Sequence, residues 1–351
     1  MSSALAADHP FHTFGDAPYL LAATGKPSPT TPVWFQRQAG RHLPEYHEVR
    51  RPGSILDTIQ VPDLAAEITL QPVRRYGVDA AVLYSDIVTP LAAIGVGVDI
   101  EPGVGPVTDP PIRSAADLAR LRPMEPGDVQ HVTETVRILA RELAVPLLGF
   151  AGAPFTLASY LIEGRPSRTH GRTKAMMLGE PKLWHELCER IADIAVEFLR
   201  LQVVNGASAL QLFDSWAGAL DPATYATHVA PHTRAIFERV ADLGVPRAHF
   251  GVGTGELLGL IADTGPDIVG IDWRVPLDLA RDRVGDTAVQ GNLDPAVCLA
   301  PIPVVEAATR DVLARNDGRP GHIFNLGHGV LPETDPAALR RAVEIVHGDR
   351  S

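Results

Sequence analysis

The sequence predicts an α/β fold, a single (β/α)8 barrel of the TIM type with its active site at the carboxyl ends of the strands. Three observations predict this. Eight short apolar runs recur along the chain, segments with helical periodicity separate them, and no repeat or Pro/Ser-rich linker divides the 351 residues. Continuous apolar strands that alternate with helices are typical of a parallel sheet, and a chain of this length can form one large barrel.

The expected strands each end in a polar or glycine-rich tip. They are 33–36, 80–85, 146–150, 209–213, 248–252, 268–271, 287–290 and 322–325. In a barrel the residues just after each strand converge on one face, so residues scattered in sequence can be read together as one site. Residues 1–15 are expected to form a loose tail and residues 16–351 a single catalytic domain.

The clearest helical segment is 181–205, which begins with proline and carries one apolar stripe. The stripe consists of Leu183, Leu187, Ile191, Ile194, Phe198 and Leu199. Segments 64–76 and 222–243 also predict helices, in which Pro72 and Pro231 are expected to cause a kink or a break.

An open doubly wound sheet is the alternative fold. It would carry a glycine-rich G-x-G-x-x-G turn near a strand end. The nearest candidate, GVGTGELLG at 251–259, lacks that spacing and comes late in the chain. A tight strand-to-helix turn is therefore the better interpretation of this segment.

Composition excludes several classes of partner. The formal net charge of −11 and the lack of a basic stripe disfavour nucleic acid and acidic membrane surfaces. Cys188 and Cys298 are far apart, so we expect no disulfide framework and a reducing compartment. Neither a secretory leader nor a membrane-spanning stretch is apparent, and a cytoplasmic protein is expected.

The segment PVWFQRQAGRHLPEY, at 32–46, places Arg37 and Arg41 four residues apart around Gly40, directly after the first expected strand. A guanidinium stays charged and offers a rigid fork of donors to a carboxylate, while glycine allows a sharp turn. The pattern predicts a site for a ligand rich in carboxylates. Arg50 is a further candidate for this cationic cluster.

The other strand tips carry hydrogen-bonding groups and a few carboxylates. They are Asp86, Gly152 with Tyr160 beyond it, Asp214 with Ser215, Asp272, Asn292 with Asp294, and His328. For Asp86 a helix cap or a salt bridge competes evenly with a functional role. Asp214 and Asp272 are better interpreted as buried partners of arginines or loop amides. An isolated histidine such as His328 is more often structural, although its place at a tip favours function.

Hydrolase and metal chemistry find little support. Ser215 has no histidine nearby in a nucleophile-elbow pattern, and G-x-S-x-G is absent, so hydrogen bonding is its expected use. No cysteine follows an expected strand directly. His185 and Cys188 share one face of a helix, but two ligands make an incomplete zinc site, and no metal is expected.

Six segments together resemble the uroporphyrinogen decarboxylase family over residues 32 to about 336. They are PVWFQRQAGRHLPEY, YSDIVTP, GFAGAPFTLASYLIEG, LFDSWAG, QGNLDP and FNLGHGVLPETDP. Gln36 and His42 depart from the family, which often has Met and Tyr there, and neither departure touches a charged contact. The resemblance implies a (β/α)8 barrel, a homodimer with facing clefts, and no metal or organic cofactor. It implies decarboxylation of the four acetates of uroporphyrinogen III, a tetrapyrrole, to the methyl groups of coproporphyrinogen III.

The resemblance also implies roles for individual residues. Asp86 matches the family's essential aspartate, and Arg37 matches an arginine proposed to deliver a proton, which makes both catalytic. The implied substrate-binding set is Arg37, Gln38, Ala39, Gly40, Arg41, Asp86, Tyr160, Ser215 and His328. The proton donor stays open between Arg37, His328 and a bound water, and Arg50 is secondary.

Two other functions compete with this interpretation. One is a barrel methyltransferase of the same superfamily, which would use zinc held by strand-end cysteines. The other is a tetrapyrrole-binding protein without catalytic activity, against which the intact set of Arg37, Arg41 and Asp86 argues.

Overall fold

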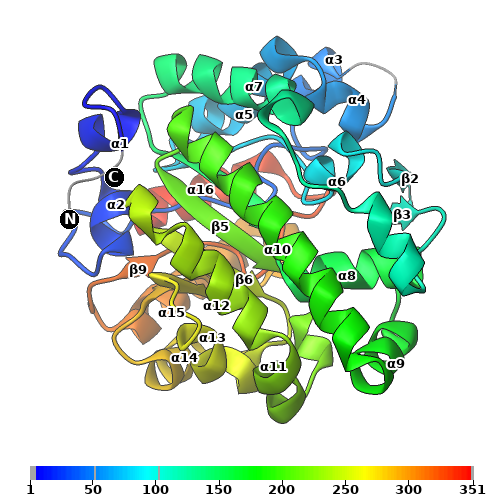
Figure 1. The fold of residues 1–351 in the computed structure, drawn as a ribbon. Helices are drawn as coiled ribbons and strands as arrows, with labels where there is room; N and C mark the ends of the chain where they lie inside the picture. The colour runs from blue at the N-terminus through cyan, green and yellow to red at the C-terminus, as the bar shows by residue number, and fades with distance from the viewer. Residues whose placement is uncertain (1–4, 51–52, 102, 349–351) are drawn as a thin grey trace.

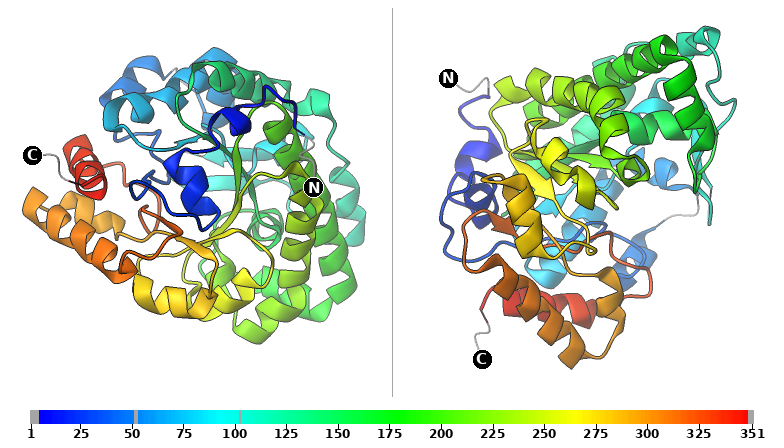
Figure 2. Two further views of the ribbon diagram at one scale, coloured as in Figure 1. Left: turned by 90° about the vertical axis from the view of Figure 1, so that its left-hand side faces the viewer. Right: turned by 90° about the horizontal axis from the view of Figure 1, so that it is seen from below.

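The computed structural model describes residues 5–50, 53–101 and 103–348. Its centre is a curled seven-stranded parallel sheet in the order β1-β4-β5-β6-β7-β8-β9, with helices around the outside (Figures 1 and 2). The strands are β1 (Ala81–Val82), β4 (Leu147–Gly152), β5 (Ala209–Asp214), β6 (Arg247–Gly251), β7 (Ile268–Gly270), β8 (Ala288–Gln290) and β9 (His322–Ile323). Seven expected strands are thus confirmed, and the sequential order of neighbours is that of a barrel rather than a doubly wound sheet.

The first expected strand, 33–36, is wrong as a strand, because it forms only a single parallel bridge between Val33 and Phe324. Phe324 donates its amide to the Pro32 carbonyl at 2.8 Å, and on the other side Asp79 donates to the Val33 carbonyl at 2.8 Å. The bridge therefore lies between the edge strands β9 and β1, in the eighth position of the barrel.

This ladder stops early because side chains take over its hydrogen bonds. The amide of Phe35 donates to Gln38 Oε1 and that of Gln36 to Asn325 Oδ1, both at 3.0 Å. Because these two amides donate to side chains and not to a neighbouring strand, the backbone leaves the sheet here and continues into the loop that carries Arg37.

The outer layer consists of helices of very different length. They are α1 (Pro10–Thr13), α2 (Pro18–Ala23), α3 (Pro44–Val49), α4 (Ile55–Ile59), α5 (Pro62–Tyr76), α6 (Thr89–Ala93), α7 (Gln130–Glu142), α8 (Pro154–Glu163), α9 (Gly171–Gly179), α10 (Pro181–Val204), α11 (Pro222–His228), α12 (Ala230–Arg239), α13 (Leu258–Ala262), α14 (Leu277–Val284), α15 (Ile302–Asn316) and α16 (Pro336–Val346). Short 3-10 helices are η1 (Ala115–Arg120), η2 (Pro126–Val129), η3 (Ala217–Ala219), η4 (Ala241–Leu243), η5 (Gly255–Leu257) and η6 (Pro295–Leu299). No helix of the described residues is both long enough and apolar enough to span a membrane.

The long helix α10 confirms the predicted stripe, all of which is buried where α10 packs against β4, α8 and α12. Burial of each such leucine, isoleucine or phenylalanine contributes roughly 1.5–3 kcal/mol. Pro231 also acts as predicted, because α11 ends at His228 and α12 begins at Ala230 with the proline in its first turn. Pro72 does not break α5, which continues to Tyr76.

Two segments differ from expectation. Residues 5–15, expected to be loose, are docked: they form α1, and His9 Nε2 lies 2.7 Å from the Val203 carbonyl oxygen. Phe11 and Phe14 pack against the core, which supplies the physical reason. Residues 1–4 lie outside the described residues. An antiparallel hairpin of β2 (Val98–Glu101) and β3 (Gly105–Thr108) was not predicted.

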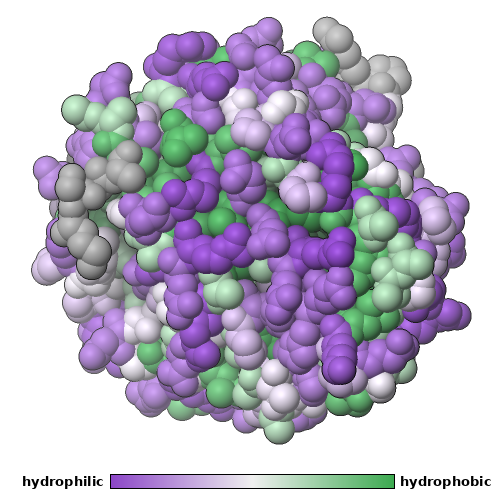
Figure 3. All heavy atoms as spheres, viewed as in Figure 1, coloured by the Kyte–Doolittle hydropathy of each residue, from purple (hydrophilic) through white to green (hydrophobic). Residues whose placement is uncertain are grey.

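The barrel interior is polar at one level and aromatic at the next. Trp34 Nε1 donates to Gln290 Oε1 and Gln290 Nε2 donates to Gln211 Oε1, each at 3.0 Å. Two residues further along β5, Phe213 meets Phe150 and Phe250 edge to face at 5.4 and 6.2 Å between ring centroids. This aromatic layer forms the floor beneath the strand tips. On the outer surface, hydrophobic residues lie in small groups among hydrophilic ones (Figure 3).

Candidate active site

The arginine loop is anchored from below by Gln38. Its side chain is fully buried, where Oε1 accepts from Phe35 and Nε2 donates to the Ala80 carbonyl at 3.1 Å. The structure therefore gives Gln38 a supporting position, because its side chain and its amide are both committed within the protein. The anchored loop carries Arg37 at a left-handed φ of 58°.

The two arginines of this loop are exposed. Neither guanidinium forms a hydrogen bond or an ion pair within the described parts of the chain. The amides of Ala39 and Gly40 likewise have no acceptor there. Free amides beside free guanidinium groups offer several donors to one carboxylate.

Asp86 follows β1 and is half-buried. Its Oδ1 accepts the Val88 amide at 3.0 Å in the turn before α6. The cap alternative is not confirmed, because the N-cap of α6 is Val88 and no side chain caps this helix. No ion pair to Asp86 is formed among the described residues. Burial raises the pKa of Asp86, opposed by the Val88 hydrogen bond and by the positive charge of Arg37. Asp86 and Arg37 are therefore close enough for the charge of one to affect the other.

Tyr160, from α8, lies beside Trp216, with 4.0 Å between the ring centroids. Burial raises the pKa of Tyr160, the charge of Asp86 raises it further, and Arg37 opposes both. The Trp216 ring also lies beside the His170 ring, with 4.8 Å between their centroids. Ser215 is half-buried, and its hydroxyl has no hydrogen-bond partner in the described chain.

Asp214 supports the Ser215 turn from behind. It is fully buried, and Thr156 Oγ1 donates to its Oδ1 at 2.7 Å. The same hydroxyl accepts the Trp216 amide at 3.2 Å, and His249 Nε2 lies 3.7 Å from Asp214 Oδ2. Asp214 is buried as predicted, but its partners are a threonine hydroxyl and a histidine, not an arginine or a loop amide.

His328 lies between Gly327 and Gly329, two positions at which neighbouring residues leave no room for a side chain. A Cβ at Gly329 would come within 2.5 Å of Arg37 Cδ, and one at Gly327 would collide with the Trp273 backbone. Nδ1 of His328 accepts the Gly329 amide at 2.7 Å, which leaves Nε2 to carry the proton of the neutral ring. Burial lowers the pKa of His328 to about 4, and the charges of Arg37 and Arg274 contribute to the lowering.

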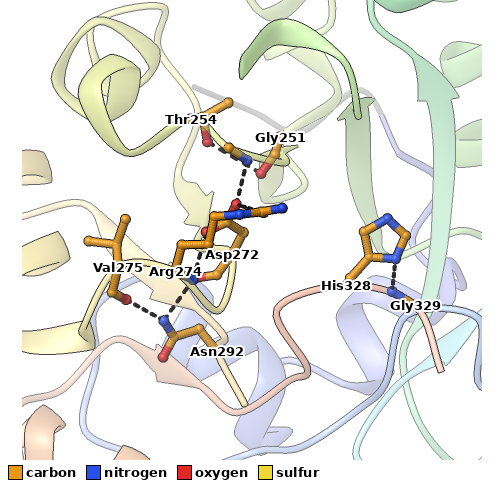
Figure 4. Close-up of polar contacts among 9 residues, drawn as sticks. Gly251, Thr254, Asp272, Arg274, Val275, Asn292, His328 and Gly329 are labelled. Atoms are coloured by element: carbon orange, nitrogen blue, oxygen red, sulfur yellow. Dashed lines mark hydrogen bonds and ion pairs between the residues drawn. The ribbon is translucent and has the colours of Figure 1, made fainter. Parts of the chain in front are cut away.

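Asp272, two residues after β7, organises the turn that carries Arg274 (Figure 4). It accepts from the Gly253 amide, the Arg274 amide at 2.9 Å and Arg274 Nη1 at 2.8 Å. Asn292 Nδ2 donates to the Asp272 carbonyl at 2.9 Å. Asp272 is thus the predicted buried partner of an arginine and loop amides. The 251–259 segment is the predicted tight turn, with Gly253 at a φ of 70°.

The remaining strand-tip candidates are structural or peripheral. Asp294 caps η6 by accepting the Ala296 amide at 2.9 Å. Arg50 donates to the Gly53 carbonyl at 3.1 Å, and its charge acts on Tyr84, two residues before Asp86. Sequence reasoning missed Trp216, Trp273 and Arg274. The rule that singled out the other strand tips could have found Arg274.

Both cysteines are buried, Cys188 in α10 and Cys298 in η6. Burial raises the pKa of both thiols, that of Cys298 to about 12, which favours the neutral thiol over the metal-binding thiolate. His185 Nδ1 lies 2.8 Å from His232 Nε2. Among the residues that were described and searched, no group of three or more His, Cys, Asp or Glu side chains could hold a metal ion.

Comparison with known proteins decides the family. The model of the family described as uroporphyrinogen decarboxylase matches residues 15–348. The chain belongs to the uroporphyrinogen decarboxylase family. Membership makes it a carboxy-lyase of porphyrin and haem biosynthesis.

Relatives in this family are similar along their whole length. The chain is 61% identical over 334 residues to uroporphyrinogen decarboxylase of Streptomyces coelicolor, covering 95% of this chain and 94% of the relative. It is 59% identical over 334 residues to that of Salinispora tropica, covering 95% and 90%.

Solved structures confirm the barrel fold. A methyltransferase from Methanosarcina mazei superposes with a TM-score of 0.73 at 16% identity, covering 94% of this chain and 97% of the other. A B12-independent methionine synthase from Shewanella gives a TM-score of 0.52 at 14% identity, covering 81% and 87%. At such identities the likeness concerns the fold alone. The uroporphyrinogen decarboxylase family, and not the methyltransferase alternative, is the one shown for this chain.

Proposed function

We propose that the strand-tip pocket removes carbon dioxide from the four acetates of uroporphyrinogen III and yields coproporphyrinogen III, with Asp86 and Arg37 at its centre. The carrying observation is the mutual electrostatic influence of Asp86, Arg37 and Tyr160, which come from three different βα segments. An unpaired guanidinium and a half-buried carboxylate thus lie within electrostatic range of each other. This combination suits a substrate with an anionic periphery and N–H groups at its centre.

The substrate itself can absorb the electrons that decarboxylation releases. Protonation of the pyrrole carbon next to the acetate makes a cationic iminium. The bond between the acetate methylene and its carboxylate then breaks, carbon dioxide leaves, and the electron pair neutralises the iminium. Protonation of the methylene carbon and loss of the ring proton give a methyl group, so each acetate consumes one proton overall. We therefore propose that the reaction needs neither a metal nor an organic cofactor.

Asp86 is proposed to accept the pyrrole N–H groups and to stabilise the iminium cation. The attraction between its carboxylate and the ring increases as positive charge develops, which is the condition for lowering the barrier. The Val88 hydrogen bond and the charge of Arg37 both favour the ionised carboxylate against the effect of burial. Arg37 thereby helps to keep Asp86 charged despite its partial burial.

Arg37 and Arg41 are proposed to bind and orient carboxylates, together with the free amides of Ala39 and Gly40. Support comes from their exposure and from the absence of internal partners in the described chain. Tyr160 and Ser215 offer hydroxyl donors on the opposite wall.

His328 is proposed to donate a hydrogen bond through Nε2. With a pKa of about 4 its ring is neutral near pH 7, so the free pocket does not hold a ready imidazolium acid. Arg37 and a bound water thus remain the proposed sources of the first proton, and the charge of Arg37 acts on Asp86.

The direct test is turnover under anaerobic conditions. Purified protein treated with a chelator and given uroporphyrinogen III should release carbon dioxide and accumulate coproporphyrinogen III. Chelator-treated and untreated protein should give equal rates. Failure of well-folded protein to release carbon dioxide would overturn the proposed activity, and a rate restored only by added metal would overturn its metal independence.

We further propose a cytoplasmic homodimer. Two exposed hydrophobic side chains support a protein contact beside the pocket: Val104, 47% exposed, and Leu178, 62% exposed. They lie on the β2–β3 hairpin and on α9, both of which contact α8. The free, buried cysteines are compatible with a reducing compartment. Sedimentation equilibrium should give twice the chain mass, and Leu178→Glu should weaken association; a monomer at every concentration would contradict the dimer.

A further inference from the structure

We infer that Arg274 is an additional substrate-binding residue, whose guanidinium holds a peripheral carboxylate of the tetrapyrrole on the β7 side of the pocket. The inference rests on the proposed function, because it extends the same site to a third arginine. It concerns a residue outside the arginine loop, contributed by the turn after β7.

Arg274 is held in place before any ligand arrives. Its Nη1 donates to Asp272 at 2.8 Å, and its own amide donates to the other oxygen of that carboxylate at 2.9 Å. Its guanidinium carbon lies 3.9 Å from the centroid of the Trp273 ring, a cation–π contact. An arginine fixed by a carboxylate and an aromatic ring loses little further entropy on binding a ligand.

Arg274 also keeps donors free for a ligand. The side chain is 52% exposed, whereas that of Asp272 is 1% exposed. Of the five N–H groups of its guanidinium, only one on Nη1 is bonded within the part of the chain that the structure describes. The exposed remainder can form the two parallel hydrogen bonds that a carboxylate accepts from arginine.

A continuous row of contacts connects Arg274 to Arg37. The Trp273 ring meets the His328 ring edge to face at 6.1 Å, and His328 is followed by Gly329, against which the Arg37 side chain lies. In Figure 4 the Arg274 guanidinium extends from the Asp272 turn toward the side on which His328 lies. Burial is the main cause of the lowered pKa of His328, and the positive charges of both arginines add to it. Arg37 and Arg274 therefore flank His328 at one rim.

Neutralisation of Asp272 is the competing explanation for Arg274. Asp272 already accepts two backbone amides, from Gly253 and Arg274, and these donors stabilise a buried carboxylate. A purely structural arginine would affect stability but not the concentration of substrate needed for turnover. The two roles thus separate in the kinetics.

The experiment compares Arg274→Gln and Arg274→Lys with wild type in the anaerobic uroporphyrinogen assay. Arg274→Gln can still donate to Asp272 but lacks the charge, so KM should rise about tenfold, the effect of one lost charge-assisted contact, with kcat within about twofold. Arg274→Lys should recover part of the loss. The matched control is Arg74→Gln, which removes an arginine of 58% exposure paired with Glu67 on an outer helix and should leave KM unchanged.

Two further measurements keep the outcomes distinct. Loss of the Arg274 charge should raise the pKa of His328, followed by NMR titration of its ring protons. Urea unfolding reports any structural effect, and if Arg274→Gln fails to fold, Arg274→Lys alone must raise KM. An unchanged KM in an active, folded variant would overturn the inference and leave Arg274 as the partner of Asp272. An inactive wild-type protein would instead overturn the proposed function.

Discussion

The arginines of the outer helices and those of the strand tips carry the same charge in different surroundings. Arg74 and Arg315 pair with carboxylates on their own helices at 2.9 and 2.7 Å, and Arg200 pairs with Asp242 at 2.7 Å. Arg37 and Arg41 have no such partner within the described residues. An exposed pair contributes up to about 1 kcal/mol of stability, and its carboxylate offsets the charge of the guanidinium. The comparison shows that the strand-tip guanidinium groups, unlike those of the outer helices, keep their donors unpaired within the described residues, as the proposed binding role requires.

Arg274 stands between the two groups. It has a carboxylate partner like the outer arginines, yet half of its side chain is exposed beside the pocket. A partner that occupies one edge of a guanidinium can orient the other edge. Pairing alone therefore does not distinguish a structural arginine from a binding one; the number of free donors and the place in the fold do.

The charge of Asp86 gives the largest expected effect. Asp86→Asn should lower kcat by about 10²–10³-fold, because an amide cannot offset the iminium cation. The matched control is Asp335→Asn at the N-cap of α16, where asparagine also caps well, and it should retain full activity. Carbon dioxide release under anaerobic conditions measures both. Near-normal turnover of Asp86→Asn would show that the Asp86 carboxylate is not needed for the reaction. The site would then consist of the unpaired arginines without an essential negative charge.

The second prediction tests whether the unpaired guanidinium matters beyond its charge. Arg37→Lys should lower kcat/KM by about 10²-fold, because lysine keeps the charge but loses the bidentate fork. Arg315→Lys in α15 should leave kcat/KM unchanged and reduce the free energy of unfolding by less than about 1 kcal/mol. Equal kinetic effects of the two substitutions would abolish the distinction between strand-tip and outer arginines.

The third prediction moves Arg37 without changing it. Gly329→Ala places a Cβ where Arg37 Cδ and Cγ lie at 2.5 and 2.8 Å, so the guanidinium must shift. A misplaced binding group should lower kcat/KM about tenfold. Gly179→Ala in α9 is the control, since its Cβ meets nothing within 4 Å, and a helical alanine there should be neutral or slightly stabilising. A crystal structure of Gly329→Ala with Arg37 unmoved and activity lost would point to another cause.

The fourth prediction concerns the pH dependence of stability, which we expect to be governed by buried histidines and not by the exposed arginines of the strand tips. Burial lowers the pKa of His42, His232 and His322 to about 4 each. The unfolded chain therefore binds more protons below its ordinary histidine pKa of about 6.5, and stability should fall as the pH drops from about 6.5 toward 4. At pH 6 the loss relative to pH 8 should be about 1 kcal/mol per histidine. Urea unfolding at several pH values measures it; a pH-independent midpoint would contradict the buried neutral rings.

Local pattern was sufficient for much of the fold. The α10 stripe was predictable because burial follows helical periodicity within one element. The strand at 33–36 was not, because its ladder ends through Gln38 and Asn325, side chains whose partners a local pattern cannot reveal. The hairpin of β2 and β3 has too short and mixed a pattern to indicate a strand pair.

For the site, the strand-tip rule collected the charged residues but not their supports. The structure brings Asp86, Tyr160 and His328 within electrostatic reach of Arg37. Gln38 looked like a ligand contact because its neighbours did, yet its side chain is buried. Trp216 and Trp273 were missed because an aromatic residue gains its role only from the ring it meets. Those partners lie on other elements of the barrel.

The bridge that joins Val33 to Phe324 has a consequence for the order in which the protein becomes active. The Gln36 amide that begins the arginine loop reaches its acceptor, Asn325, 289 positions away in the chain. Contacts of such high sequence separation form late in folding, because a long loop must close first. During synthesis Arg37 emerges early but can take its place only after β9 has left the ribosome. The loop that is proposed to bind the substrate therefore gains this anchor only when the barrel is complete.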